Sequence, residues 1–218
     1  MKNKIFTYIL TGIFLGLFSL SLAAQETFTA KEVLDQTASS LKKAGGIKAD
    51  FTLTTYSHGS PQGETKGTIC LMGNRFRLNT PNVITWFDGK TQWSYLPANN
   101  EVNIANPTQE ELQGINPLAF LTMYKQGYTC RMGATKQYGG RAVHEVSLTA
   151  EDYEQQIAHL TLYIDRTTLF PIYIKVKEAG QNYNIITVSN YTANEKWQEK
   201  DFRFNPEQYP DAEVIDLR

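Results

Sequence analysis

Hydrophobic positions recur at helical spacing in one early segment and then alternate along most of the chain. Thr29 and Glu32 form a capping box before the helical segment, and Gly45-Gly46 supplies its end. The pattern predicts one amphipathic helix over about residues 30–44. Its apolar stripe consists of Val33, Leu34, Thr37, Ala38 and Leu41.

From Ile47 onward the period changes to two, which is typical of half-buried strands. Turn residues such as Gly73-Asn74 and Asp88-Gly89 separate the alternating segments. Short strands at this spacing favour an antiparallel sandwich or barrel over alternating strand–helix units. The pattern predicts about 11 strands, at residues 47–53, 67–72, 75–79, 83–87, 91–96, 101–105, 128–136, 142–149, 157–165, 172–177 and 183–191.

A helical segment interrupts the alternation between residues 108 and 127. Thr108 and Glu111 form a second capping box, and Asn116-Pro117 places proline at a first helical position. Residues 117–124 are apolar on most of their circumference, and Gly127 ends the segment. Because such a surface has to be buried, we expect it to lie on the face or mouth of the sheet.

Residues 1–24 have the pattern of a secretory signal peptide. Lys2 and Lys4 precede an apolar stretch over residues 5–22, and Ala23-Ala24 offers small residues for cleavage. An uncleaved membrane anchor is the alternative, because the stretch approaches the length of a bilayer span. We expect cleavage and export, which leave a single soluble domain over residues 25–218.

Composition and motifs narrow the function classes. The net charge is −1 and the chain has no long Lys/Arg block, so we expect no nucleic-acid partner. His58, His144 and His159 lie in separate segments, and none has a second ligand at metal-binding spacing. The sequence contains no nucleophile elbow, zinc-protease motif or phosphate-binding glycine loop. We therefore expect a protein that is not an enzyme and has no metal or cofactor.

Cys70 and Cys130 lie in predicted strands on either side of the helical segment. An oxidising compartment would permit a disulfide between them, and two free thiols are the alternative. The spacing alone does not decide between these states, because a disulfide depends on the distance between the Cα atoms.

Apolar side chains gather on one face of the predicted sheet and on the helical segment. One interpretation is an ordinary core, and the other is a curved sheet around an apolar ligand cavity with the helices as a lid. The candidate ligand-binding residues are Ile69, Leu71, Phe76, Leu78, Leu118, Phe120 and Leu121.

Four segments resemble the periplasmic outer-membrane lipoprotein carrier family, which is also called LolA-like. They are residues 47–52, a strand that starts with Gly67, the element DGKTxWxYxP over residues 88–97, and FxFxP over residues 202–206. These segments occur in the family's order, together with the early helix and the Asn116-Pro117 segment. The resemblance therefore covers essentially the whole chain after residue 24.

The resemblance implies a mainly β fold, a half-open antiparallel β-barrel of about 11 strands with a helical lid over an apolar cavity. By motif position, Phe76 and Leu78 fall among the family's cavity residues, and Leu118 falls in its lid. The family has a basic residue that helps to hold the lid just after the strand matching residues 67–72. Here that place is Gly73-Asn74, with Arg75 and Arg77 nearby, which departs from the family's pattern.

The function implied by the resemblance is that of a periplasmic chaperone for lipoproteins. It would receive acylated lipoproteins from an inner-membrane ABC transporter and deliver them to an outer-membrane acceptor, and we expect it to act as a monomer. One alternative is a carrier of another amphiphile, such as a glycolipid or an envelope pigment. A second alternative is a sensor domain of similar fold.

Overall fold

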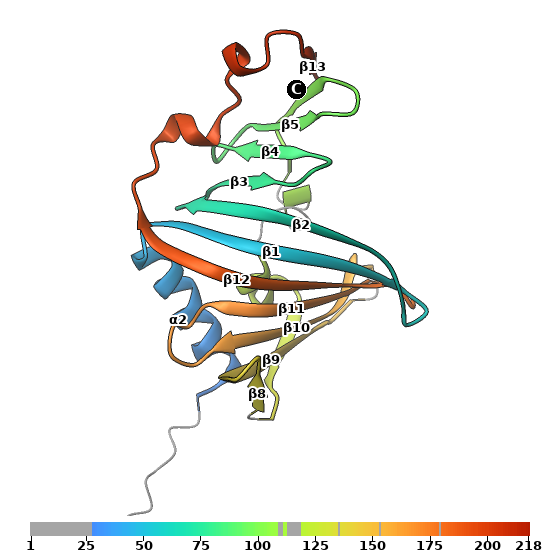
Figure 1. The fold of residues 1–218 in the computed structure, drawn as a ribbon. Coiled ribbons are helices and arrows are strands. Elements are labelled where there is room, and N and C mark those ends of the chain that lie inside the picture. The colour runs from blue at the N-terminus through green and yellow to red at the C-terminus, as the bar shows by residue number, and fades with distance from the viewer. Residues whose placement is uncertain (1–27, 109–110, 113–118, 135, 153, 179) are drawn as a thin grey trace, which may run out of the picture.

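The computed structural model describes residues 28–108, 111–112, 119–134, 136–152, 154–178 and 180–218. The predicted signal peptide, Asn116-Pro117 and Leu118 lie outside these residues. The described part of the chain forms a large curved sheet with a long α-helix on one side (Figure 1).

All 13 strands of the described residues belong to one open sheet with the order β13-β6-β5-β4-β3-β2-β1-β12-β11-β10-β9-β7, and β8 pairs with β9. Neighbouring strands are antiparallel except for β13, which lies parallel to β6. The strands are β1 (Gly46–Ser57), β2 (Ser60–Met72), β3 (Arg75–Asn79), β4 (Ile84–Phe87), β5 (Gln92–Leu96), β6 (Glu101–Ala105), β7 (Tyr128–Met132), β8 (Lys136–Tyr138), β9 (Arg141–Ala150), β10 (Ile157–Asp165), β11 (Pro171–Glu178), β12 (Tyr183–Glu195) and β13 (Glu213–Asp216).

The open and mainly antiparallel sheet confirms the mainly β part of the predicted fold class, but the expected number of about 11 strands is wrong, since the sheet of the described residues has 13. The predicted strand over residues 128–136 is divided into β7 and β8. The division lies at Gly133, whose N–H donates to the Glu145 carbonyl at 2.8 Å. The second additional strand is β13, in the C-terminal segment, where no strand was predicted.

The helix α2 (Ala30–Lys43) confirms the predicted helix and its cap. Thr29 Oγ1 accepts from the Glu32 N–H at 3.2 Å, and the Thr29 N–H donates to Glu32 Oε2 at 2.7 Å. The chain then turns directly into β1 through Gly46, where an added Cβ would lie 2.1 Å from the Glu195 carbonyl oxygen. Only glycine permits β12 to approach β1 this closely.

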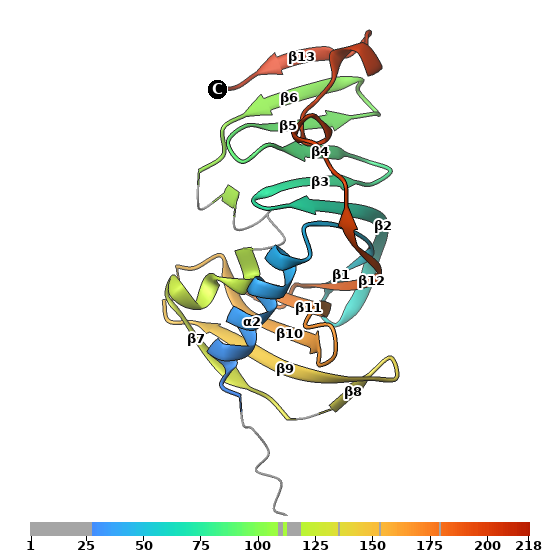
Figure 2. The ribbon, with the colours of Figure 1, turned by 90° about the vertical axis from the view of Figure 1, so that its left-hand side faces the viewer.

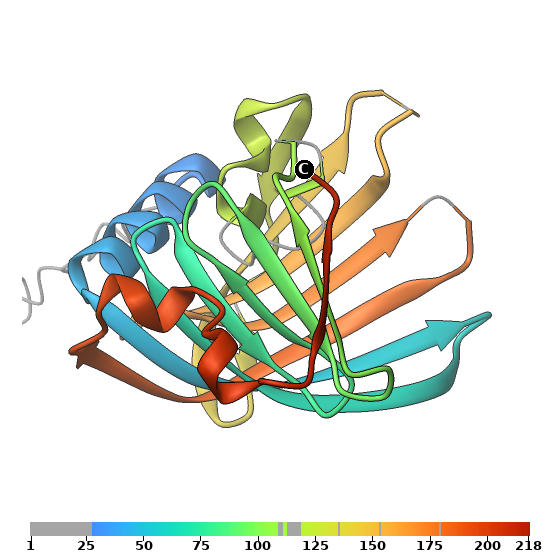
Figure 3. The same cartoon turned by 90° about the horizontal axis from the view of Figure 1, so that it is seen from above.

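The inner face of the sheet is the face that packs against α2 (Figures 2 and 3). Val33, Leu34 and Leu41 of the helix share one buried cluster with strand residues such as Leu148 and Leu160. Full burial of one such side chain contributes about 1.5–3 kcal/mol. This cluster is the core that fixes α2 across the sheet.

Two short 3₁₀ turns lie beside α2 on the inner face, η1 (Ala119–Leu121) and η2 (Met123–Lys125). The expected second capping box precedes them, since the Glu111 N–H donates to Thr108 Oγ1 at 3.3 Å. Phe120, Leu121 and Met123 are buried, as expected for an apolar segment on the sheet. Residues 111–112 are α-helical and residues 119–121 and 123–125 are 3₁₀-helical, so the described part of this segment is helical as expected.

The C-terminal segment after β12 packs on the outer face, where it includes η3 (Glu199–Phe202) and η4 (Pro206–Gln208). Trp86 of β4 points to this face and makes edge contacts with Phe204 at 5.8 Å and Tyr209 at 5.9 Å between ring centroids. Phe202 is fully buried. The FxFxP element therefore acts as a cover for the outer face.

Arg75 and Arg77 both face this C-terminal segment and not the inner face. Arg75 Nη2 lies 2.6 Å from Glu199 Oε1, and the Arg77 guanidinium lies 5.4 Å from the centre of the Trp197 ring. A guanidinium over an indole contributes about 0.5–2 kcal/mol. The two arginines thus hold the C-terminal segment.

Candidate functional site

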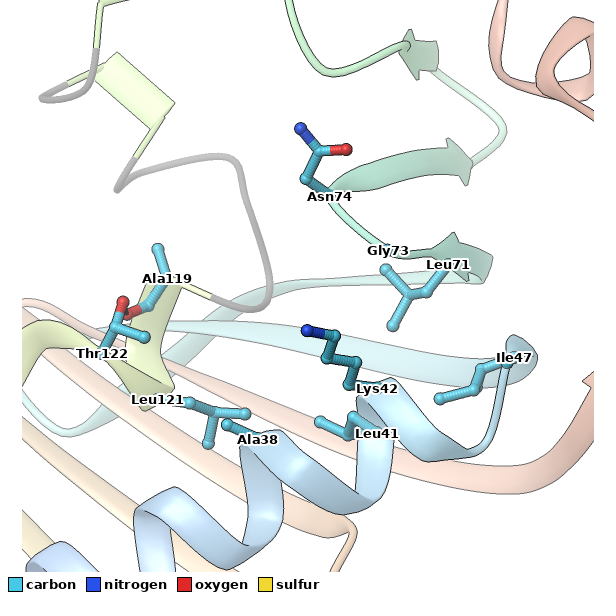
Figure 4. A pocket seen from close by; sticks show the side chains of 11 residues that line it. Ala38, Leu41, Lys42, Ile47, Leu71, Gly73, Asn74, Ala119, Leu121 and Thr122 are labelled. Atoms are coloured by element: carbon cyan, nitrogen blue, oxygen red, sulfur yellow. Dashed lines mark hydrogen bonds between the residues drawn. The ribbon is translucent and has the colours of Figure 1, made fainter.

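A pocket of about 400 Å³ lies between the C-terminal half of α2 and the inner face of the sheet (Figure 4). Pockets that bind small molecules usually have volumes of about 300–1,000 Å³. Four segments contribute the lining residues: Ala38, Leu41, Lys42 and Gly45 from α2 and its end, Ile47 from β1, Leu71, Gly73 and Asn74 from β2 and its turn, and Ala119, Leu121 and Thr122 from η1 and the residue after it.

The helix contributes one side of the pocket because residues three and four positions apart lie on the same helix face. Ala38, Leu41 and Lys42 follow this spacing, and Gly45 continues it beyond the helix end. Ala38 is the smallest of the three helical side chains, so it leaves space where the helix approaches η1. The spacing that buries α2 therefore also forms the pocket wall.

The opposite side is the hairpin turn between β2 and β3. Gly73 adopts a φ of +63°, a left-handed conformation that glycine accepts without strain. The Asn74 side chain packs against Gly89, where an added Cβ would lie 2.7 Å from Asn74 Nδ2. Gly89 belongs to the DGKTxWxYxP element, so this element supports the turn that lines the pocket.

The pocket floor is continuous with the core. Ile47 and Leu71 are directly paired across β1 and β2, and Leu71 is paired with Phe76 on β3. Phe76 is fully buried and stacks on Phe87 at 5.2 Å between ring centroids. An apolar ligand in the pocket would therefore rest on a firm apolar floor.

The structure places the predicted ligand-binding residues on one surface but at different depths. Leu71 and Leu121 line the pocket. Ile69, Phe76 and Phe120 lie buried in the adjoining cluster, and the half-buried Leu78 packs against it. Leu118 lies outside the described residues.

Several lining residues were not predicted from the sequence. Ala38 and Leu41 belong to the apolar stripe of the helix, which was assigned to packing alone. Nothing in the sequence marked Lys42 as a pocket residue, because a lysine near the C-terminus of a helix is common. Ala119 and Thr122 flank the predicted residues Phe120 and Leu121 in the sequence, and this position was the one signal that could have identified them as lining residues.

The lining of the pocket offers mainly apolar contacts and few groups that could take part in a reaction or bind a metal. Lys42 is the one charged residue among the lining residues of the described chain, and no carboxylate lines the pocket. Nor do His, Cys, Asp and Glu side chains gather in groups of three or more that could hold a metal ion, within the ranges that the structure describes. Burial lowers the pKa of His144 and His159, and both lie outside the pocket lining.

The two cysteines are free, which answers the question that the sequence left open. Cys70 faces outward on β2, where Arg77 Nη2 lies 3.7 Å from its Sγ and burial raises the pKa of the thiol. Cys130 on β7 is paired with Leu148 and packs against the inner cluster. The strands β1, β12, β11, β10 and β9 separate the two positions.

None of the helices in the described ranges has the length and apolar character needed to cross a bilayer. This finding concerns the residues after position 27, since the apolar stretch at 5–22 lies outside them.

Comparison with known proteins gives one family match, for which the family is described as outer membrane lipoprotein carrier protein LolA, over residues 20–181. No curated protein sequence matches the chain significantly. An uncharacterized conserved protein from Thermus thermophilus has a similar structure, with a TM-score of 0.60, 14% identity, and coverage of 86% of this chain and 98% of that one. This likeness supports the fold.

Two further solved structures are more distant. A LolA superfamily protein from Nitrosomonas europaea has a TM-score of 0.46 at 10% identity, over 82% of this chain and 99% of that chain. The Mycobacterium tuberculosis lipoprotein LppX has a TM-score of 0.43 at 14% identity, over 76% of this chain and 97% of that chain.

Proposed function

The chain belongs to the outer membrane lipoprotein carrier (LolA) family, and from this premise we propose that it carries lipoprotein acyl chains through the periplasm. Residues 1–24 would direct export and be removed, and residues 25–218 would form the carrier domain. The domain would receive its cargo from an inner-membrane lipoprotein-releasing ABC transporter and pass it to an outer-membrane acceptor. This role requires binding and release of the cargo without a catalysed reaction.

The observation that carries the proposal is the apolar pocket beneath α2 and η1. Burial of one methylene group contributes about 0.8 kcal/mol, so an acyl chain of about 12 carbons gains roughly 10 kcal/mol gross. If a methylene group takes roughly 30 Å³, as a water molecule does in the liquid, the pocket holds about one such chain. Cargo with more chains would need a wider cavity than this.

We propose that the two 3₁₀ turns act as a lid that moves away from α2 during loading. The polar contacts that join η2 to α2 are exposed. Tyr124 Oη donates to Asp35 Oδ1 at 2.7 Å, and Lys125 Nζ lies 3.6 Å from the same oxygen. An exposed ion pair contributes about 0.2–1 kcal/mol, so these contacts oppose opening only weakly.

The predicted residues then bind the cargo at different depths. Leu71 and Leu121 contact the first acyl chain, because they already line the pocket. Leu118 would contact cargo from the lid. The residues that become accessible as the lid moves are Ile69, Phe76, Leu78 and Phe120.

The test fills the pocket without removing a core side chain. Ala38→Phe places a ring in the pocket, whereas Ser39→Phe adds the same ring at the next, exposed position of α2. Binding of a synthetic triacylated cysteine peptide is measured by calorimetry, and folding is measured by urea unfolding. We expect Ser39→Phe to bind as the unmodified protein does and Ala38→Phe to bind at least about tenfold more weakly.

Two results would contradict the proposal. Unchanged binding by a folded Ala38→Phe variant would show that the pocket is not the acyl site. Absence of binding by the unmodified protein would show that acylated peptides are not its cargo.

A carrier of a different amphiphile is the second candidate function, and the pocket volume favours it. A space for about one chain suits a single-chain amphiphile without any movement of the two 3₁₀ turns. The two candidates differ in what the protein retains when it is purified from its own compartment.

A further inference from the structure

Lys42 is placed unusually for a surface lysine, because it lines an apolar pocket. Figure 4 shows its side chain extending from α2 into the space below the β2–β3 turn, with the amino group on the side of Ala119 and Thr122. The apolar side chains of Leu41, Ile47, Leu71 and Leu121 lie around it and are buried, whereas Lys42 is exposed. The pocket thus has an apolar lining and a cationic side chain at its solvent-facing rim.

The charge at the rim has no counter-charge in the pocket. No Asp or Glu lines it within the described part of the chain. The lysines that form ion pairs in the described part of the chain are Lys66, Lys125 and Lys136. No ion pair involves Lys42 among the described residues, so its ammonium is available to a ligand.

A structural role at the helix end does not account for this position. A cation in the last turn stabilises a helix through the partial negative charge of its terminal carbonyl groups. Lys42 and Lys43 both lie in the last turn of α2 and serve this purpose equally well. They differ in that Lys42 lines the pocket and Lys43 does not.

We propose that Lys42 binds a negative charge at the polar end of an acyl chain in this pocket. The site would then take a single-chain anionic amphiphile, with either a fatty-acid carboxylate or a lipid phosphate at the rim. The inference rests on the proposed function in one respect, which is that the pocket accepts an acyl chain.

The experiment compares ligands of equal chain length that differ in their head group. Dodecanol, dodecanoate and dodecyl phosphate each displace an uncharged fluorescent apolar probe from the mature chain at neutral pH and low ionic strength. The variants are Lys42→Gln, Lys42→Arg and, as the matched control, Lys43→Gln. The quantity measured is the ratio of each anion's affinity to that of dodecanol.

We expect this ratio to fall by about two- to fivefold in Lys42→Gln, the range of a partly exposed ion pair. It should be retained in Lys42→Arg and Lys43→Gln, and it should shrink as salt screens the interaction. A larger ratio for dodecyl phosphate assigns the site to phosphate head groups, and a larger ratio for dodecanoate assigns it to carboxylates.

An unchanged ratio in Lys42→Gln would overturn the inference and leave the acyl pocket intact. An equal fall in Lys43→Gln would also overturn it, because the effect would then be a general surface charge. If dodecanol also fails to displace the probe, the pocket is not an acyl site and both proposals fall.

Discussion

Truncation of two leucines on the same inner face tests whether Leu71 borders an existing space or lies in a closed core. Leu71 is 6% exposed and lines the pocket, whereas Leu148 is fully buried and packs beneath α2. We compare Leu71→Ala with Leu148→Ala. The two changes delete the same atoms, so a difference between them reports on the surroundings.

The expected loss of unfolding free energy has two parts, the lost burial of the deleted atoms and the cavity that they leave. Removing buried methylene groups costs about 0.8 kcal/mol each, or about 2 kcal/mol for either leucine. Leu148→Ala also leaves a closed cavity, which adds about 24 cal/mol per Å³ and brings the total to about 3–5 kcal/mol. Leu71→Ala enlarges a space that already exists, so its cost should stay at about 2 kcal/mol.

Urea unfolding followed by tryptophan fluorescence gives both free energies, and thermal unfolding provides a second measurement. Each kcal/mol corresponds to about 2–4 °C in the midpoint for a domain of this size. We expect Leu148→Ala to melt several degrees below Leu71→Ala. Equal losses of about 3 kcal/mol or more would refute the reasoning, because Leu71 would then be packed as a closed core residue.

Three further predictions follow from the backbone and from titrating side chains. Gly46→Ala should cost about 1–3 kcal/mol by overpacking against the Glu195 carbonyl, whereas Gly63→Ala, with nothing near its added Cβ, should be nearly neutral in urea unfolding. Burial lowers the pKa of His159, so stability is present above about pH 6.5 and is lost as the pH falls below it. His159→Gln should flatten this acidic limb of a plot of melting temperature against pH, and an unaltered slope would assign the limb to other groups. Burial raises the pKa of Tyr173 to about 12. The contribution of its neutral form to the free energy of unfolding is therefore fully present below about pH 10 and is lost between about pH 10 and 12. Tyr173→Phe should reduce this alkaline loss.

Elements whose signals are local could be predicted almost residue by residue. The helix is defined by the capping box and by the glycines after it, and β10 by alternation over residues 160–164. The first half of β2 was missed, because residues 60–66 are mostly exposed and show no alternation. These residues form a strand because they pair with the second half of β1.

Elements that depend on distant pairing could not be predicted. The four residues of β13 form a strand because β6 offers an unpaired edge more than 100 residues earlier in the chain. The FxFxP element was recognised as a motif, but its contact with Trp86 on the outer face depends on the path of the chain after β12. Local patterns carry no information on such a path.

The candidate site could be predicted only in part for a similar reason. Leu71 and Leu121 followed from apolar patterns and do line the pocket. Ala38 and Lys42 did not, because helical spacing shows which face is buried but not where packing against that face is incomplete. The pocket exists where the end of α2 leaves space against the β2–β3 turn and η1, which is a property of the assembled fold.

The most direct test of the central claim is mass spectrometry of the material that co-purifies with the tagged protein, extracted gently from the cells that produce it. The account predicts peptides with acylated N-terminal cysteines from many lipoproteins, and their loss from the Ala38→Phe variant. Retention of free lipids or of one pigment without acylated peptides would contradict lipoprotein transport and favour the second candidate. A protein that carries nothing and also binds no apolar probe would show that the pocket beneath α2 is part of an ordinary core.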